Sequence, residues 1–116
     1  MATTSSKLKT LGTLIKTKAT VYPYERKKES KSCVVYSLIS TVPIYDQSKN
    51  LLLEKNRIQL TCWDTTLNKS RTLADKMKTL LQINNTDFEL SFIIDDKTIK
   101  DIETGLYKTY IDLFIW

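Results

Sequence analysis

The chain has 116 residues, a length that suits one domain with its own core, and we take residues 1–116 as a single domain. Hydrophobic residues make up 41% and charged residues 27%, close to the average of soluble globular proteins. There is neither an apolar run long enough for a membrane helix nor an N-terminal signal block, so we expect a protein of the cytoplasm without a membrane partner. The complete absence of histidine removes the commonest general base, the usual nucleophile–histidine pairs and most catalytic zinc sites, and predicts a non-enzymatic protein without cofactor or metal.

The net charge of +5 is unevenly distributed along the chain. Residues 1–31 hold eight Lys or Arg against two acidic residues, whereas residues 86–116 hold three against seven. A basic beginning and an acidic end indicate complementarity between protein surfaces at least as strongly as nucleic-acid binding. Basic residues of 7–31 in one copy would then face acidic residues of 87–103 in a neighbouring copy.

The first predicted element is a short amphipathic helix. Ser5 or Ser6 can cap it, and apolar residues follow at helical spacing at Leu8, Leu11, Leu14 and Ile15. A brief extended segment is expected at 21–24, followed by a charged loop at 25–31.

The middle of the chain predicts two strands joined by a long connection. Residues 33–40 are rich in β-branched and aromatic side chains, and residues 57–63 alternate with Ile58, Leu60 and Cys62 on one side. The segment 41–56 between them contains Pro43 and many polar residues, and we expect it to be a loop that becomes ordered in an assembly.

The last part of the chain predicts a second helix and two strands. Asp64, Thr65 or Thr66 can cap the helix, whose apolar face is Leu73, Ala74, Met77, Leu80 and Leu81. Residues 88–94 alternate as a strand, 95–97 are expected to form a turn, and 107–116 form the closing strand. Strands that are neighbours along the chain favour antiparallel pairing. The sequence therefore predicts an α+β fold with two layers, a mostly antiparallel sheet and two helices packed on one face.

The two cysteines, Cys33 and Cys62, lie in alternating apolar segments. We interpret both as reduced core thiols, because a metal site would need more ligands than this chain offers.

Two segments are candidate interaction sites with two readings each. The basic residues Arg26, Lys27 and Lys28 form a solvated loop or, alternatively, contact phosphate. The run Leu51, Leu52 and Leu53 either covers an edge of the core or is a contact site for another protein.

Aromatic and acidic residues give two further candidate groups. Trp63 and Trp116, with Tyr110 and Phe114, lie opposite the core faces of their strands, so they anchor an interface or belong to a sheet that is buried on both sides. Asp95 and Asp96 are expected to lie in an acidic turn; the alternative is that they hold a hard cation together with Asp101 and Glu103.

Four motifs in order resemble the family of tail-completion proteins of long-tailed bacteriophages, which is related in fold to lambda-type tail terminators. They are a Val-Val-Tyr strand at 34–40, a strand ending in Trp63-Asp64, a helix bearing Ala74 and Leu80 directly after it, and a Glu-Thr-Gly-Leu-Tyr segment at 103–107 before the closing strand. The likeness covers residues 8–116.

The resemblance implies a structural virion protein, assembled in the host cytoplasm. It would form a ring, a hexamer, at the head-proximal end of the tail and contact the tail tube protein and the connector of the head. DNA would pass through the lumen without sequence-specific binding. The family supplies no catalytic residues. The alternative reading of the sequence is a small basic nucleic-acid-binding or regulatory domain.

Overall fold

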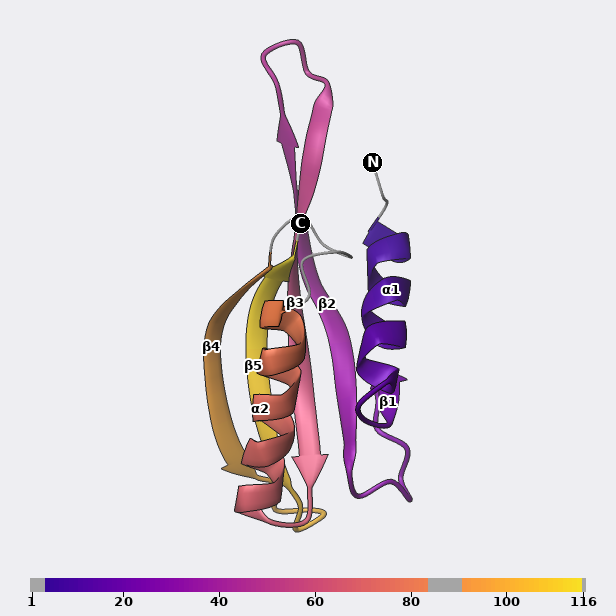
Figure 1. The fold of residues 1–116 in the computed structure, drawn as a ribbon, viewed down its shortest axis with the longest axis vertical. Helices are drawn as coiled ribbons and strands as arrows, with labels where there is room; N and C mark the ends of the chain where they lie inside the picture. Colours follow the sequence, from indigo (N-terminus) through magenta and orange to yellow (C-terminus); the bar gives the residue numbers. More distant parts are fainter. Residues whose placement is uncertain (1–3, 84–90, 116) are drawn as a thin grey trace.

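A computed structural model describes residues 4–83 and 91–115 of the chain. Along the chain it contains helix α1 (Thr4–Lys16), strands β1 (Val21–Pro23), β2 (Cys33–Tyr45) and β3 (Leu51–Asp64), helix α2 (Leu67–Ile83), and strands β4 (Ser91–Lys100) and β5 (Tyr107–Ile115). The five strands form one sheet in the order β1-β2-β3-β5-β4, and both helices lie against it (Figure 1). The predicted α+β class and two-layer arrangement are confirmed.

The core lies between the helices and one face of the sheet. Alternation places Ile58, Leu60 and Cys62 of β3 on that face, and the register brings Leu60 beside Ile111 of β5. Helix α1 contributes Leu11 and Ile15, and helix α2 contributes its predicted apolar stripe of Leu73, Ala74, Met77, Leu80 and Leu81. Because the two helices share one core cluster, they cover the same face of the sheet, and the opposite face carries neither of them.

Helix α2 is fixed at its first turns by hydrogen bonds. The hydroxyl of Thr66 accepts from the Lys69 backbone N–H at 3.2 Å, which identifies the cap among the three predicted candidates. Ser70 Oγ donates to the carbonyl oxygen of Cys62 at 2.9 Å and lies 2.8 Å from the hydroxyl of Thr109, which is itself 2.9 Å from that of Thr98. This buried chain of hydroxyls joins the helix to β3, β5 and β4, so the orientation of α2 is tied to three strands.

Glycine at position 12 allows α1 to lie close to the sheet. A Cβ at this position would meet Tyr36 Oη at 3.2 Å. The glycine that weakens the helix by propensity therefore makes room for a tyrosine of β2.

Two expectations about strand pairing and turns were wrong. Strand β1 pairs with β2 in parallel, from Val21 with Val34 to Pro23 with Tyr36, because the segment 24–32 is long enough to carry the chain back to the same end of the sheet. Asp95 and Asp96 lie within β4 rather than in a turn. The strand can continue through these two residues because Asp96 points toward α2. Its negative charge is neutralised there by Arg71 and Lys78.

The prediction that Thr41–Asn56 forms a loop was also wrong. These residues extend β2 and β3 as a two-stranded antiparallel ribbon, with Thr41 opposite Asn56 and Tyr45 opposite Leu51. Pro43 is compatible with this ribbon because β2 has a neighbour on only one side there, as prolines in strands require. Strand β5 ends opposite Asn56, so the ribbon projects beyond the sheet (Figure 1) and contributes to the longest dimension of the molecule, 52 Å against 26 and 22 Å.

Candidate interaction surfaces

The projecting ribbon, Thr41–Asn56, is hereafter called the hairpin arm. All residues from 39 to 52 are exposed, among them the large apolar side chains of Val42, Ile44, Tyr45, Leu51 and Leu52. Leu51 and Leu52, two of the predicted site residues, are 40% and 55% exposed, so these two do not cover an edge of the core. The side chain of the third, Leu53, lies outside the described part. An isolated two-stranded ribbon is marginal in water, and exposed apolar surface of this kind marks contact sites.

The tip of the hairpin arm is a defined turn. Asp46 Oδ1 accepts hydrogen bonds from the backbone N–H groups of Ser48 at 2.8 Å and Asn50 at 2.9 Å, and Lys49 adopts a positive φ of 66°. The hydrogen bond from the Asn50 N–H is the main cause of a lowered pKa of the Asp46 carboxyl group. At its base, the arm is joined across by a 3.0 Å hydrogen bond from Thr41 Oγ1 to Asn56 Oδ1. Hydrogen bonds therefore stabilise the hairpin arm both at its tip and at its base.

The second surface is the helix-free side of the sheet, hereafter called the open face. Trp63, Tyr110 and Phe114 lie on it, each half-buried, as their register opposite the core positions requires. Cations lie over the aromatic rings: Arg26 at 5.0 Å and Lys108 at 5.1 Å from the centre of the Trp63 ring, and Lys55 at 4.0 Å from that of Phe114. Trp116, which was predicted to belong to this group, lies outside the described residues.

The predicted basic loop divides into two kinds of residue. Arg26 is half-buried on Trp63, and its guanidinium donates to the carbonyl oxygens of Lys27 at 3.1 Å and Lys28 at 3.2 Å. Arg26 thus holds the loop in shape, whereas Lys27 and Lys28 are exposed, with Lys27 5.5 Å from the ring centre of Tyr22. The alternation of Lys108, Tyr110, Asp112 and Phe114 along β5 was the available signal for the open face. Lys108 belongs to this pattern, whereas Arg26 and Lys55, which lie over Trp63 and Phe114, come from other segments and gave no local signal.

Three of the four acidic residues whose side chains the structure describes after position 90 have cationic partners within the subunit. Asp96 is held by Arg71 at 3.3 Å and by Lys78, and Asp112 lies 3.6 Å from Arg57. The Asp101 carboxylate accepts from the Thr104 hydroxyl at 2.6 Å, the largest cause of its lowered pKa, and lies 3.8 Å from Lys108 Nζ. The fourth described acidic residue in this part, Glu103, is exposed and has no hydrogen bond or ion pair with the described residues. The side chain of Asp95 lies outside the described part.

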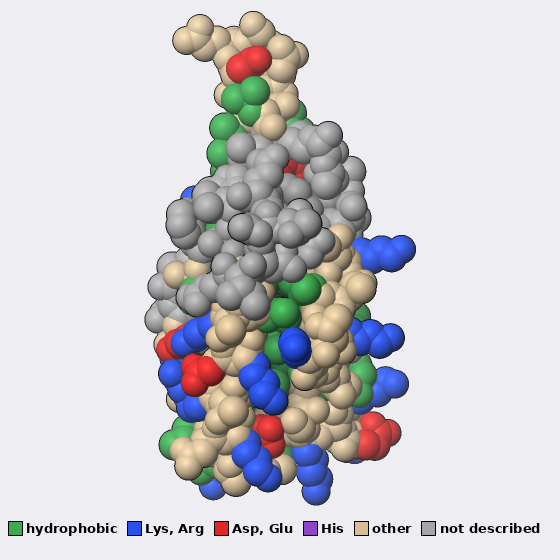
Figure 2. All heavy atoms as spheres, viewed as in Figure 1, with side chains coloured by type: hydrophobic (Ala, Val, Ile, Leu, Met, Phe, Trp, Pro, Cys, Tyr) green, Lys and Arg blue, Asp and Glu red, His purple; other side chains and the backbone are tan. Residues whose placement is uncertain are grey.

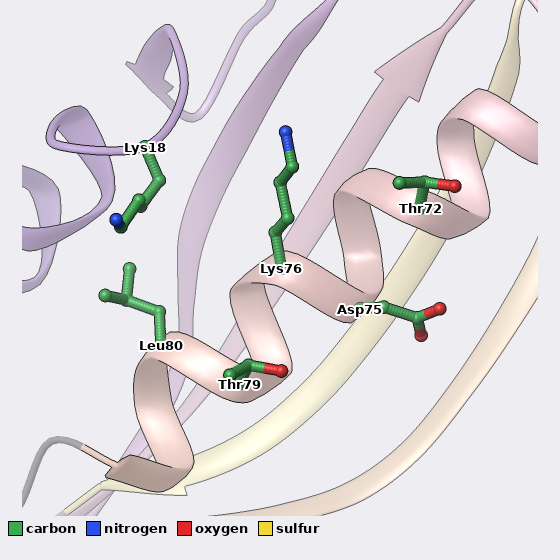
Figure 3. Close-up of a pocket in the computed structure, with 6 residues that line it drawn as sticks. All are labelled: Lys18, Thr72, Asp75, Lys76, Thr79 and Leu80. Atoms are coloured by element: carbon green, nitrogen blue, oxygen red, sulfur yellow. The ribbon is translucent and has the colours of Figure 1, made fainter.

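A groove runs between α2 and the turn after α1 (Figure 3). It has a volume of about 590 Å³ and is lined by Lys18, Thr72, Asp75, Lys76, Thr79 and Leu80. Lys18 and Lys76 extend from opposite walls, while the Asp75 carboxylate points away from Lys18 (Figure 3). Figure 2 shows Lys and Arg side chains spread over the lower part of this side, with hydrophobic side chains visible between them. The described lining of the groove offers amines, hydroxyls and one carboxylate.

Two further properties concern the described residues alone. They contain no cluster of three or more Cys, Asp or Glu side chains placed to hold a metal ion. Neither of the helices in that part of the chain is long and apolar enough to span a bilayer.

Cys33 and Cys62 are free and buried, as predicted. They lie on opposite faces of the sheet, since Cys62 pairs with Val34, the neighbour of Cys33. Burial raises the pKa of the Cys62 thiol to about 12 and also raises that of Cys33.

The raised thiol pKa values predict a loss of stability at alkaline pH. A raised folded-state pKa leaves stability intact below the unfolded value of 9.0 and removes it as pH rises toward 12, because only the unfolded chain ionises in that interval. We expect the urea midpoint to fall between pH 9 and pH 11, and to fall less in Cys62→Ala measured against its own value at pH 7. Both thiols should react with an aromatic disulfide reagent rapidly only in urea; rapid reaction of two thiols in the folded protein at pH 8 would contradict their burial.

Comparison with known proteins finds a likeness of fold. No family model and no curated protein sequence matches the chain. Among solved structures, a chain from the structure described as "Virion of native gene transfer agent (GTA) particle" matches with a TM-score of 0.64 at 10% sequence identity. The match covers 96% of this chain and 88% of that chain. At this identity the comparison shows a shared α+β fold over nearly the whole length of both chains.

Proposed function

We propose that this protein is a structural component of a phage-like virion. The observation that carries the proposal is the likeness of fold to a chain of a gene transfer agent particle, which spans nearly all of both proteins and leaves no large part of either unmatched. The order of sequence motifs described above supports the same class of protein.

Within that class, we propose that the chain caps the head-proximal end of a tail tube as a hexameric ring and joins the tail to the head. Its partners would be the tail tube protein and the connector of the head, and DNA would pass through the ring. The hairpin arm supports an assembly role, because its exposed apolar side chains need a covering surface in an assembled particle. A ring of identical subunits uses two different surfaces at each boundary, and a projecting arm supplies one of them.

We also propose that the protein acts without catalysis. The sequence contains no histidine, and Asp96, one of the four acidic residues considered for a cation site, is held by Arg71 and Lys78. A metal-dependent nuclease activity that is lost on replacing Asp95 and Asp96 would overturn this part of the proposal.

Electron microscopy of tails made with and without the protein tests the proposed role. We expect tails lacking it to end without a cap and to remain separate from heads, and we expect addition of the purified protein to restore joining. Light scattering on the purified protein or on its complex with tails measures the ring, whose mass should be six times the 13.5 kDa subunit. Tails that join heads normally in the absence of the protein would contradict the proposal.

A further inference from the structure

The open face holds a cluster of cations and aromatic rings near the end of the sheet opposite the hairpin arm. Lys108 extends between two rings, with its Nζ 5.1 Å from the centre of Trp63 and 5.5 Å from that of Tyr110. Lys97 of β4 lies 5.9 Å from the Tyr110 ring, and Arg26 covers Trp63 at 5.0 Å. Four elements of the chain thus bring three cations to two neighbouring rings.

The amino groups of this cluster retain hydrogen-bonding capacity. A cation that lies over a ring is attracted by the π electrons without donating its N–H groups to an acceptor, so an ammonium group keeps donors for a ligand. The carboxylate described beside the cluster is that of Asp101, 3.8 Å from Lys108 Nζ, whereas Asp112 lies further along the sheet beside Arg57. Lys27, which is exposed and lies over Tyr22, adds a fourth positive charge at the same end.

We propose that the open face binds the phosphate backbone of nucleic acid through Arg26, Lys27, Lys97 and Lys108. Charge complementarity selects this ligand: the cluster is cationic, and phosphates accept hydrogen bonds from ammonium groups while both remain partly hydrated. An apolar protein surface is a poor occupant, because covering it would remove water from the exposed Lys27 and Lys97 without supplying acceptors. The aromatic rings would hold the lysine stems in place rather than read bases, so the binding is expected to be independent of sequence.

This inference deepens the proposed passage of DNA through a ring, but the contact itself is a property of the single subunit. It rests on the proposed function only in taking the DNA that passes through the ring as the natural ligand.

Fluorescence anisotropy with a labelled 20-base-pair duplex tests the inference on the full chain. Lys97→Gln/Lys108→Gln removes two charges from the open face, and Lys69→Gln/Lys76→Gln removes two exposed charges from α2 on the other side of the sheet as a matched control. With up to four phosphate contacts, the wild-type log affinity should fall with log salt at a slope of about −3 to −4. We expect the open-face variant to lose about tenfold or more in affinity and to flatten that slope by about 2, while the control loses less than about threefold.

Three results would overturn the inference. The first is that the wild type does not bind the duplex at 50 mM salt. The second is that the two variants lose equal amounts of affinity for the duplex. The third is that the wild type binds polyglutamate more tightly than a duplex of the same net charge. The last result would assign the open face to an acidic protein surface. Thermal unfolding of both variants establishes that they remain folded. Because head joining is scored separately in tails, loss of DNA binding with intact joining separates this inference from the proposed function.

Discussion

Removal of the hairpin arm should abolish assembly and leave the subunit folded. We expect this result when Val42–Lys55 is replaced by Asn-Gly, which joins Thr41 directly to Asn56 through a two-residue turn suited to hairpins. The pair at the junction is kept because it closes the ribbon with a 3.0 Å hydrogen bond and because Asn56 is buried. A deletion confined to Lys49–Glu54 is less informative, since it would remove one strand of the ribbon and leave residues of β2 unpaired.

The physical reason for the expected separation is the different burial of the two parts. None of the arm's described side chains beyond its base belongs to the buried core cluster, so its loss should change the free energy of unfolding by no more than about 1 kcal/mol. Circular dichroism in urea measures stability, and light scattering and head joining measure assembly. A shortened protein that unfolds would show that the arm belongs to the subunit's own fold, and one that still joins heads would show that the arm has another role.

The elements predicted correctly from sequence are those whose apolar residues repeat with a clear period. Strand β3 has the alternating apolar residues Ile58, Leu60 and Cys62. Helix α2 has an apolar stripe at helical spacing, formed by Leu73, Ala74, Met77, Leu80 and Leu81. In both elements the pattern of buried residues is visible in the local sequence. The hairpin arm lacks that signal, because its apolar residues face solvent and Pro43 interrupts the run. Its strand character comes from the register that β2 and β3 already have at their buried ends, which continues outward past Asn56.

The interaction surfaces were only partly predictable because they depend on contacts between distant residues. Alternation predicted that Trp63 and Tyr110 point away from the core, and it also placed Lys108 on their side of β5. The other two cations beside these rings come from the loop at position 26 and from β4, so sequence alone did not reveal them. The ion pairs of Asp96 could not be predicted from sequence, because its partners Arg71 and Lys78 lie on the preceding helix. Charge totals over segments therefore do not reveal that three described carboxylates have partners within the subunit, and the predicted contact between basic and acidic segments of neighbouring copies stays a prediction.

The largest loss of stability from a single substitution is expected for Leu60→Ala. Leu60 is fully buried in the middle strand of the sheet, with Tyr36 and Ile111 as its cross-strand neighbours and both helices in the same core cluster. Truncation to alanine removes buried apolar surface and leaves a cavity that close-packed neighbours fill only in part, at a cost of about 2 to 5 kcal/mol. For a domain whose free energy of unfolding is on the order of 5 to 15 kcal/mol, this is a large fraction of the total.

Leu52→Ala is the matched control for Leu60→Ala, because it makes the same chemical change at a leucine that is 55% exposed on the hairpin arm. We expect Leu52→Ala to change the free energy of unfolding by no more than about 0.5 kcal/mol, as surface substitutions usually do, and to weaken head joining. Leu60→Ala should instead lower the midpoint, and it should still support joining at temperatures where it remains folded, because it leaves the arm and the open face unchanged. The comparison requires urea unfolding and joining assays on both proteins at one temperature. A loss below about 1 kcal/mol for Leu60→Ala would contradict its central place in the core, and equal joining by Leu52→Ala and the wild type would mean that this leucine contributes no contact in the assembled particle.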